Sequence, residues 1–176
     1  MKSTLQLLAF FHVLLQIMPL CRAACHPDDL KKGLEVITKL HRQSIDLLMK
    51  ALALSSHNTI TSLDLEEVLH THGDYDTQKE NYVSAVKRVY EISWKLDRNI
   101  VKDGRWSKFS KMAVLIRNKT NVLNQSCFRA NNITVDTSGG EDQLIEKLLK
   151  AVLEMFVAET FLNEHFNHLI EPFSKI

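Results

Sequence analysis

Apolar residues between positions 106 and 127 recur every three or four residues, which is the spacing of one face of an α-helix. Arg117, Asn118 and Asn121 fall on the opposite side of the same helix. The apolar stripe consists of Trp106, Phe109, Met112, Ala113, Ile116, Thr120, Leu123 and Cys127. An amphipathic helix buries such a stripe against other elements, so the pattern predicts a core helix that ends at a cysteine.

The same spacing predicts a helix over residues 28–54, where Pro27 suits the first turn and Asp28 and Asp29 suit the positive end of the helix dipole. We expect His41, on its apolar side, to be a boundary residue with a satisfied hydrogen bond rather than a metal ligand. The predicted stripe is Leu30, Leu34, Ile37, His41, Ile45, Leu48 and Leu52. The predicted solvent face carries Lys32, Glu35, Lys39, Asp46 and Lys50.

A further helix is predicted to begin at the sequence Thr77-Gln78-Lys79-Glu80, which has the form of a capping box, and to end near residue 101. Its stripe contains Val83, Val86, Val89, Tyr90, Leu96 and Ile100. The short turn at residues 102–104 contains Gly104, so this helix and the 106–127 helix are predicted to be antiparallel neighbours.

The last predicted helix covers residues 141–171 and is ended by Pro172. Its apolar stripe is interrupted by Glu159 and Asn163. Either two helices meet near residues 157–160, or this part of one long helix faces outward. The absence of glycine and proline from 141–171 favours one helix.

Two longer connections separate these helices. Residues 55–76 are polar at first and then have a pattern that predicts a short helix at 62–71, and residues 128–140 are polar and end in paired glycines. No segment alternates between apolar and polar residues as a strand does. The sequence therefore predicts an all-α fold of four to five helices.

The first 23 residues have the pattern of a cleaved signal peptide. A basic start at Lys2 precedes an uncharged apolar run over residues 5–20, and Cys21 and Ala23 are small residues at the two positions that signal peptidase reads. The run is short for a membrane span. We therefore expect a secreted, extracellular protein that is not inserted in a membrane, with one mature domain over residues 24–176.

Charge and cysteine content both become simpler once the signal is removed. Loss of Lys2 and Arg22 reduces the 22 basic residues to 20, against 21 acidic residues, so nothing in the balance favours nucleic acid as a partner. Of the 3 cysteines, Cys21 leaves with the signal. Cys25 and Cys127 remain as a pair in an oxidising compartment, which predicts one disulfide.

Three asparagines have the N-x-S/T pattern of glycosylation acceptors. They are Asn118, Asn124 and Asn132. The first two lie on the predicted 106–127 helix, and the third lies on the connection after it.

The sequence contains no pattern typical of an enzyme or of a cofactor or metal site. His70 and His72 have the wrong spacing for one helical face, and His165 and His168 lack a further ligand at a recognised spacing. There is no G-x-S-x-G, no glycine-rich phosphate loop and no H-E-x-x-H. We expect a protein without enzymatic activity, bound metal or cofactor.

The chain resembles the type I interferons of bony fishes, in particular the group with two cysteines. The most similar passage is VYEISWKLDRNIVKDGRWSKFSKMAVLIRNKTNVLNQSC, residues 89–127. The segment Ser44-Ile45-Asp46-Leu47-Leu48 is a weaker match. Interferons of this group end in a helix with an alanine-tryptophan-glutamate motif, whereas this chain ends in AETFLNEHFNHLIEPF before its last residues.

The resemblance implies an up-up-down-down bundle of the class II helical cytokines. Such a cytokine acts as a monomer that joins two class II receptor chains and starts kinase and transcription-factor signalling toward an antiviral state. One receptor chain would contact the first helix, the connection near residues 58–67 and the last helix, and the other would contact the later helices. The residues expected at the first interface are Lys39, Arg42, Asp46, Lys50 and Phe161.

Two other classes fit the same sequence pattern. Another helical cytokine, such as an interleukin-10-like or short-chain interleukin, would be distinguished by the receptor pair that responds. A secreted carrier of small apolar ligands would enclose a cavity between its helices and would copurify with lipid. The density of leucine, isoleucine, valine and phenylalanine in the stripes favours a filled core over a carrier.

Overall fold

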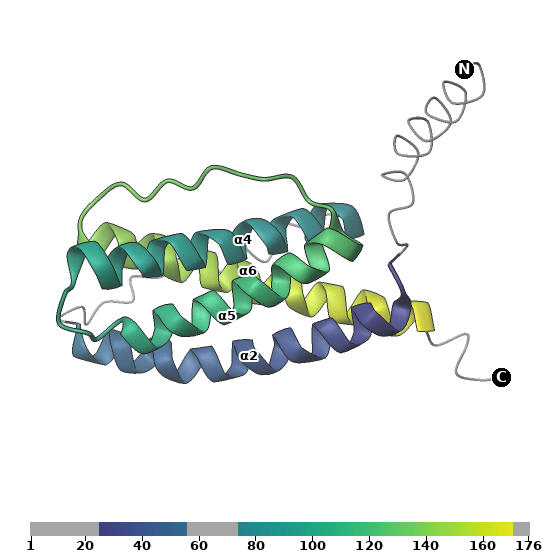
Figure 1. Ribbon diagram of the computed structural model, residues 1–176, viewed down its shortest axis with the longest axis horizontal. Coiled ribbons are helices and arrows are strands. Elements are labelled where there is room, and N and C mark those ends of the chain that lie inside the picture. Colours follow the sequence, from purple (N-terminus) through teal and green to yellow (C-terminus); the bar gives the residue numbers. More distant parts are fainter. Residues whose placement is uncertain (1–24, 56–73, 171–176) are drawn as a thin grey trace, which may run out of the picture.

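The computed structural model describes residues 25–55 and 74–170, and of residues 167–170 only the backbone. The described part contains four α-helices, two short π-helical turns and no strand (Figure 1). This confirms the all-α prediction. The predicted signal peptide and the predicted short helix at 62–71 lie outside the described residues.

The first helix, α2, spans Pro27–Leu54. His26 caps it, with its Nδ1 accepting a hydrogen bond of 3.3 Å from the backbone N–H of Asp28. Pro27 occupies the first turn, where a missing N–H costs nothing, and Asp28 and Asp29 follow it at the positive end of the dipole. The predicted bounds of this helix are confirmed.

The second helix, α4, spans Tyr75–Lys95 and continues as the π-helical turn η2, Leu96–Ile100. It begins before the predicted capping box at Thr77, so that prediction is wrong. The N-cap is Asp74, whose side chain accepts a hydrogen bond of 2.8 Å from the backbone N–H of Thr77. A carboxylate satisfies this N–H and also interacts favourably with the helix dipole, which explains the earlier start.

The third helix, α5, spans Ser107–Leu123 and continues as the π-helical turn η3, Asn124–Phe128. A short turn joins it to η2, and Gly104 within this turn has φ of 83°, a left-handed conformation that favours glycine. The tight turn makes α4 and α5 antiparallel neighbours, as the sequence predicts (Figure 1).

The fourth helix, α6, is unbroken over Glu141–Ile170, which confirms the prediction of one long helix. The connection over residues 129–140 brings the chain back past α4 to the start of α6 (Figure 1). It begins with Arg129, which has φ of 55° and whose backbone N–H donates to the carbonyl of Asn124.

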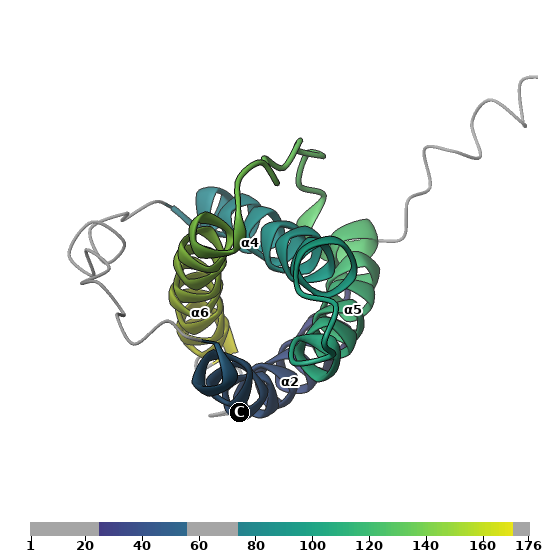
Figure 2. The same cartoon turned by 90° about the vertical axis from the view of Figure 1, so that its left-hand side faces the viewer.

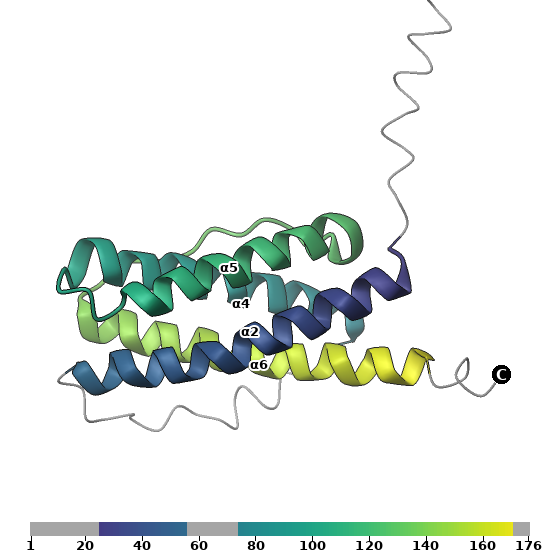
Figure 3. The same cartoon turned by 60° about the horizontal axis from the view of Figure 1, so that its bottom comes forward.

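Viewed along its axis, the bundle has α2 and α4 at opposite corners, with α5 on one side between them and α6 on the other (Figure 2). From another direction, Figure 3 shows α2 crossing in front of α6. Each helix therefore has two neighbours that it packs against and one that lies diagonally across the core.

The core contains the residues predicted from the stripes, with a few corrections. Ile45 and Ile100 were expected inside but are exposed, and Ser44 and Tyr82 are buried instead. His41 is fully buried rather than at the boundary. The largest fully buried side chains are Trp106, Tyr82, Phe109, Ile37, Ile92, Leu96, Ile116, Leu144, Leu148, Met155, Leu162 and His41.

The predicted disulfide between Cys25 and Cys127 is confirmed, with an S–S distance of 2.03 Å. It joins the start of α2 to η3 and so fixes these two chain segments at one end of the bundle. Among the described residues, no helix has the length and apolar character needed to cross a membrane.

Candidate functional site

The outer face of α2 carries four of the five residues expected at a receptor interface. Lys39, Arg42, Asp46 and Lys50 are all exposed, and none forms an ion pair with another described residue. They occupy successive turns because positions three and four apart lie on one side of a helix. The part of the expected interface near residues 58–67 lies outside the described residues.

Two exposed apolar residues extend this charged face, and the sequence analysis missed both. Ile45 is 41% exposed and Met49 is 53% exposed, and their spacing from Arg42 places the three residues along one line of α2. The helix turns Ser44 inward at 2% exposure, and that rotation carries Ile45 outward. An arginine beside adaptable apolar side chains is typical of the contact surfaces of binding proteins.

The fifth expected residue, Phe161, lies on another edge of the bundle. It is half-buried on α6 and stacks on His165, with ring centroids 6.3 Å apart. His165 in turn stacks on Tyr75 of α4 at 4.5 Å. The structure therefore places Phe161 at the edge between α4 and α6 and does not bring it together with the four residues on the outer face of α2.

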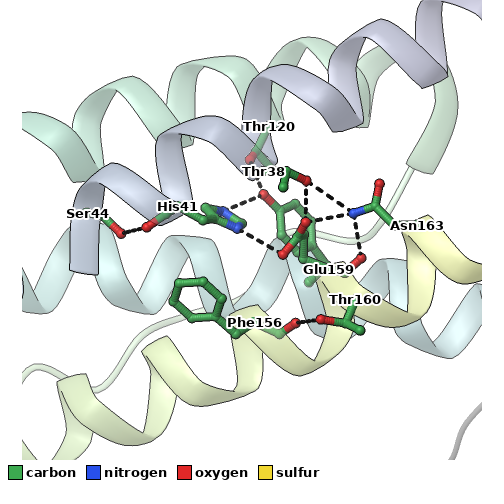
Figure 4. A network of polar contacts seen from close by, with 9 residues as sticks. Thr38, His41, Ser44, Thr120, Phe156, Glu159, Thr160 and Asn163 are labelled. Atoms are coloured by element: carbon green, nitrogen blue, oxygen red, sulfur yellow. Dashed lines mark hydrogen bonds and ion pairs between the residues drawn. The ribbon is translucent and has the colours of Figure 1, made fainter. Parts of the chain in front are cut away.

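A buried polar cluster lies between α2, α4 and α6, where the sequence showed an interruption of the last apolar stripe (Figure 4). Glu159 is only 6% exposed, so the prediction that this patch faces outward, or that two helices meet there, is wrong. Its carboxylate accepts hydrogen bonds from Thr38 of α2 and, at 2.6 Å, from Asn163. The Nδ1 of His41 lies 3.6 Å from the other carboxylate oxygen.

The cluster continues through His41 to α4 and α5. The Nε2 of His41 lies 3.1 Å from the hydroxyl of Tyr82, and that hydroxyl lies 3.2 Å from Oγ1 of Thr120 (Figure 4). The Oγ of Ser44 donates at 2.7 Å to the backbone carbonyl of His41. Polar atoms from all four helices therefore meet inside the bundle, and most of them have a hydrogen-bond partner that offsets their desolvation, although Nδ1 of His41 makes no hydrogen bond to another described residue.

The electrostatics of the cluster favour an ionised Glu159. Burial alone raises the pKa of this carboxyl group, but the nearby imidazole of His41 and hydrogen bonds from Thr38 and Asn163 outweigh it and hold the pKa below its ordinary value. Burial also raises the pKa of Tyr82, which stays a neutral phenol. Because His41 and Tyr82 are 0% exposed, no substrate could reach them, and the arrangement fits a structural role.

The three glycosylation acceptors have different surroundings. Asn118 is exposed on α5. Asn124 is partly buried, and its side chain bridges to Ala130, accepting at 2.8 Å from the backbone N–H and donating at 3.4 Å to the carbonyl. Asn132 is exposed on the connection, and its Oδ1 accepts a hydrogen bond of 2.6 Å from Lys87 of α4.

A hollow of about 290 Å³ opens between α4, α5 and the 129–140 connection. Its lining includes Lys87, Tyr90, Arg117 and Asn132. A second hollow of about 390 Å³ shares Tyr90 with the first and extends to Trp94, which is 44% exposed. The sequence analysis did not identify this region, because its residues come from three segments and follow no single period.

No group of three or more histidine, cysteine, aspartate or glutamate residues that could hold a metal ion occurs within residues 25–55 and 74–170. The chain matches no protein-family model, no curated protein and no solved structure.

Proposed function

We propose that the protein is a secreted cytokine of the type I interferon kind, which joins two class II receptor chains at a cell surface and starts antiviral signalling. The proposal rests on one observation above others: the described residues form a disulfide-bonded bundle of four helices whose two long connections let the helices run in pairs. Two long crossover connections are a feature of cytokine bundles with up-up-down-down topology.

Contacts between the helices support that topology. The disulfide places the start of α2 beside the end of α5, and the short turn makes α4 antiparallel to α5. Tyr75 at the start of α4 stacks on His165 near the end of α6. In Figure 1, α2 and α4 correspondingly run in one direction and α5 and α6 in the other. The separation between Leu54 and Tyr75 is long enough for a connection that returns along the bundle.

The outer face of α2 is the surface that we assign to one receptor chain. Arg42, Ile45 and Met49 combine a cation with exposed apolar groups, and Lys39, Asp46 and Lys50 lie beside them. Interface energy is usually concentrated in a few such residues, with arginine among the most frequent. Phe161 belongs to a separate edge with Tyr75 and His165, where it would contact a receptor only if the interface extends over α6.

A carrier of small apolar ligands receives less support than a cytokine. The centre of the bundle is filled by large side chains, among them Trp106, Tyr82, Phe109 and Met155. A carrier requires an enclosed apolar space, whereas the two hollows described above lie at the surface and are lined by charged and amide groups.

The test uses purified protein of residues 24–176 on cells that display defined pairs of class II cytokine receptors. We expect phosphorylation of transcription factors and induction of antiviral genes only when an interferon receptor pair is present. Substitution of Arg42 or Met49 by alanine should weaken the response about tenfold, which corresponds to about 1.4 kcal/mol of binding energy. Lys102→Ala, an exposed change in the turn between η2 and α5, is the control and should leave the response unchanged.

A folded protein that is silent on every interferon pair would contradict the proposal. A response that requires an interleukin receptor pair would assign the chain to another branch of the helical cytokines. Equal losses from Arg42→Ala and Lys102→Ala would remove the assignment of the α2 face.

A further inference from the structure

The two surface hollows beside α4 share Tyr90 and Glu91 in their lining, and we call them together the α4 groove. Its floor is Lys87, Tyr90, Glu91 and Trp94 on α4, and Arg117 of α5 forms part of one wall. The connection that contains Asn132 forms the opposite wall. Tyr90 and Trp94 are one helical turn apart, or about 6 Å along the axis, so the groove has room for adjacent rings of a chain-like ligand.

The chemistry of the α4 groove suits an uncharged polar ligand with flat apolar faces. The guanidinium of Arg117 lies 3.9 Å from the ring centre of Tyr90, which holds it in a fixed orientation. Its Nη2 donates at 3.3 Å to Oδ1 of Asn118, whereas its buried Nε has no hydrogen-bond partner among the described residues, so a donor remains for a ligand. Asn121 adds an amide, Glu91 adds a carboxylate, and the exposed ring of Trp94 supplies a flat apolar surface. Sugars carry hydroxyl and acetamido groups around such flat faces.

The acceptor Asn132 lies on the rim of the groove and is held there by α4. Lys87 donates to its Oδ1 at 2.6 Å and also to the backbone carbonyl of Ile133. This contact uses the oxygen of the side-chain amide and leaves Nδ2, the atom that carries an N-linked sugar, without a partner among the described residues. Asn124 lines the same hollow, but its Nδ2 donates to Ala130.

We propose that Asn132 carries an N-linked glycan whose first N-acetylglucosamine units pack in the α4 groove against Arg117, Tyr90 and Trp94. The inference rests on the proposed secretion of the chain. In the modification step a bond forms between Nδ2 of Asn132 and C1 of the sugar, while the bond from C1 to a polyprenyl diphosphate donor breaks. The diphosphate leaves with the electron pair, and the amide loses one proton.

The proposed packing predicts that the glycan prevents other proteins from binding at the α4 groove. Tryptophan, tyrosine and arginine are the residues that most often dominate protein interfaces, and Trp94, Tyr90 and Arg117 lie together in this groove. A sugar that covers them removes this part of α4 from contact with other proteins. Asn118 does not line either hollow, so a glycan there would leave the groove open.

The two tryptophans of the chain make a specific test possible. Trp106 is fully buried and Trp94 is 44% exposed, so quenching of tryptophan fluorescence by acrylamide reports on Trp94. The full chain is expressed in cells that glycosylate secreted proteins. Mass spectrometry of its tryptic peptides then gives the occupancy of each acceptor. Thr134→Val removes the acceptor pattern but retains Asn132 and its hydrogen bond with Lys87. Asn118→Gln is the matched control, because it removes the other exposed acceptor and still offers an amide oxygen to Arg117, which donates to Asn118 at 3.3 Å.

We expect an occupied Asn132 in the wild type and a quenching constant that rises about twofold in Thr134→Val, because the face of Trp94 is uncovered. Asn118→Gln should keep the wild-type value. Arg117→Gln should retain the glycan and still raise quenching, since the sugar loses its partner. An empty Asn132 in secreted protein, or an occupied Asn132 with equal quenching in wild type and Thr134→Val, would overturn the inference. Neither readout depends on a receptor, so the proposed signalling function is tested separately.

Discussion

Along one side of α2 the contacts with α5 are covalent and apolar, since Cys25 is bonded to Cys127 and the backbone at Gly33 lies against Leu123. Along the other side the contacts with α6 are polar, because Thr38 and His41 meet Glu159. A disulfide acts mainly by restricting the unfolded chain. Hydrogen bonds from fixed positions act on the folded state, where they favour one register of two helices over its alternatives. We call the side of α2 that faces α5 the covalent edge and the side that faces α6 the polar edge. The two edges stabilise the same helix by different means.

Removal of the covalent contact is expected to have the largest effect. The cysteines are 102 residues apart, so the double variant Cys25→Ser/Cys127→Ser should lose about 4 kcal/mol of unfolding free energy by the loop-entropy relation. Urea unfolding measures this loss. Reduction of the wild type should produce the same loss, and two titratable thiols in the oxidised mature protein would contradict the bond.

The polar edge is expected to respond almost as strongly to the loss of its carboxylate. Glu159→Ala leaves His41, Thr38 and Asn163 without their common partner, and breaking a buried pair in this way costs about 3 kcal/mol. Glu164→Ala, an exposed change on the same helix, is the control and should alter the unfolding free energy by less than about 0.5 kcal/mol. Equal effects of the two changes would show that the cluster does not stabilise the bundle.

A smaller loss of unfolding free energy is expected at the covalent edge, where α2 and α5 pack closely. A Cβ on Gly33 would lie 2.4 Å from Cδ2 of Leu123, so in Gly33→Ala either the Leu123 side chain must move or α2 and α5 must separate. Overpacking costs about 1–3 kcal/mol, and the better helix propensity of alanine offsets about 1 kcal/mol of that, which leaves a net loss near 1 kcal/mol. The measurement is again urea unfolding.

Gly140→Ala is the control for this prediction, because a Cβ there meets nothing within 4 Å. It should change stability by less than about 0.5 kcal/mol. A more stable Gly33→Ala protein would mean that the contact between α2 and α5 is looser than the structure indicates.

The smallest expected effect is on the pH dependence of the unfolding free energy, to which Glu159 of the polar edge contributes. The folded state holds the pKa of Glu159 below its ordinary value, so its contribution is present above the unfolded pKa and is lost as pH falls through the folded pKa. Unfolding free energy should therefore decline in acid, below the ordinary glutamate pKa, and Glu159→Gln should show a shallower decline. Asp74, Asp103 and Asp136 also have lowered pKa values, so only the difference between the two proteins reports on Glu159. Identical pH profiles would contradict the account.

The covalent edge and the polar edge also differ in how far sequence could predict them. The two cysteines that remain after the predicted signal peptide predict a bond, and that bond is present. Glu159 instead interrupts an apolar stripe, and its partner His41 lies 118 positions earlier, on another helix. Periodicity describes one helix at a time, so it assigns an isolated carboxylate to the surface and cannot identify a partner that only tertiary packing supplies.

Helix positions followed from the sequence more closely than helix rotation and caps did. The stripe of the 106–127 helix was largely correct, because Trp106, Phe109, Ala113, Ile116, Thr120 and Leu123 are all buried. On α2, Ile45 was placed inside because isoleucine is apolar, whereas Ser44 is inside because its hydroxyl donates to the carbonyl of His41. At α4 the sequence predicts a capping box that begins at Thr77, whereas the observed N-cap is Asp74, whose side chain accepts a hydrogen bond from the backbone N–H of Thr77. The α4 groove had no sequence signal, since it depends on how the connection crosses α4.

The disulfide makes the chain between residues 25 and 127 a closed ring, and that ring contains α2, α4 and α5 but not α6. Among the described residues, side-chain contacts and the 129–140 connection attach α6 to it. Under mechanical load applied between Cys25 and the end of α6, the force would bypass the three helices inside the ring and act on α6. The stacking of His165 on Tyr75 and then the contacts of Asn163 and Glu159 with Thr38 would break as α6 separates, and the ring would remain closed.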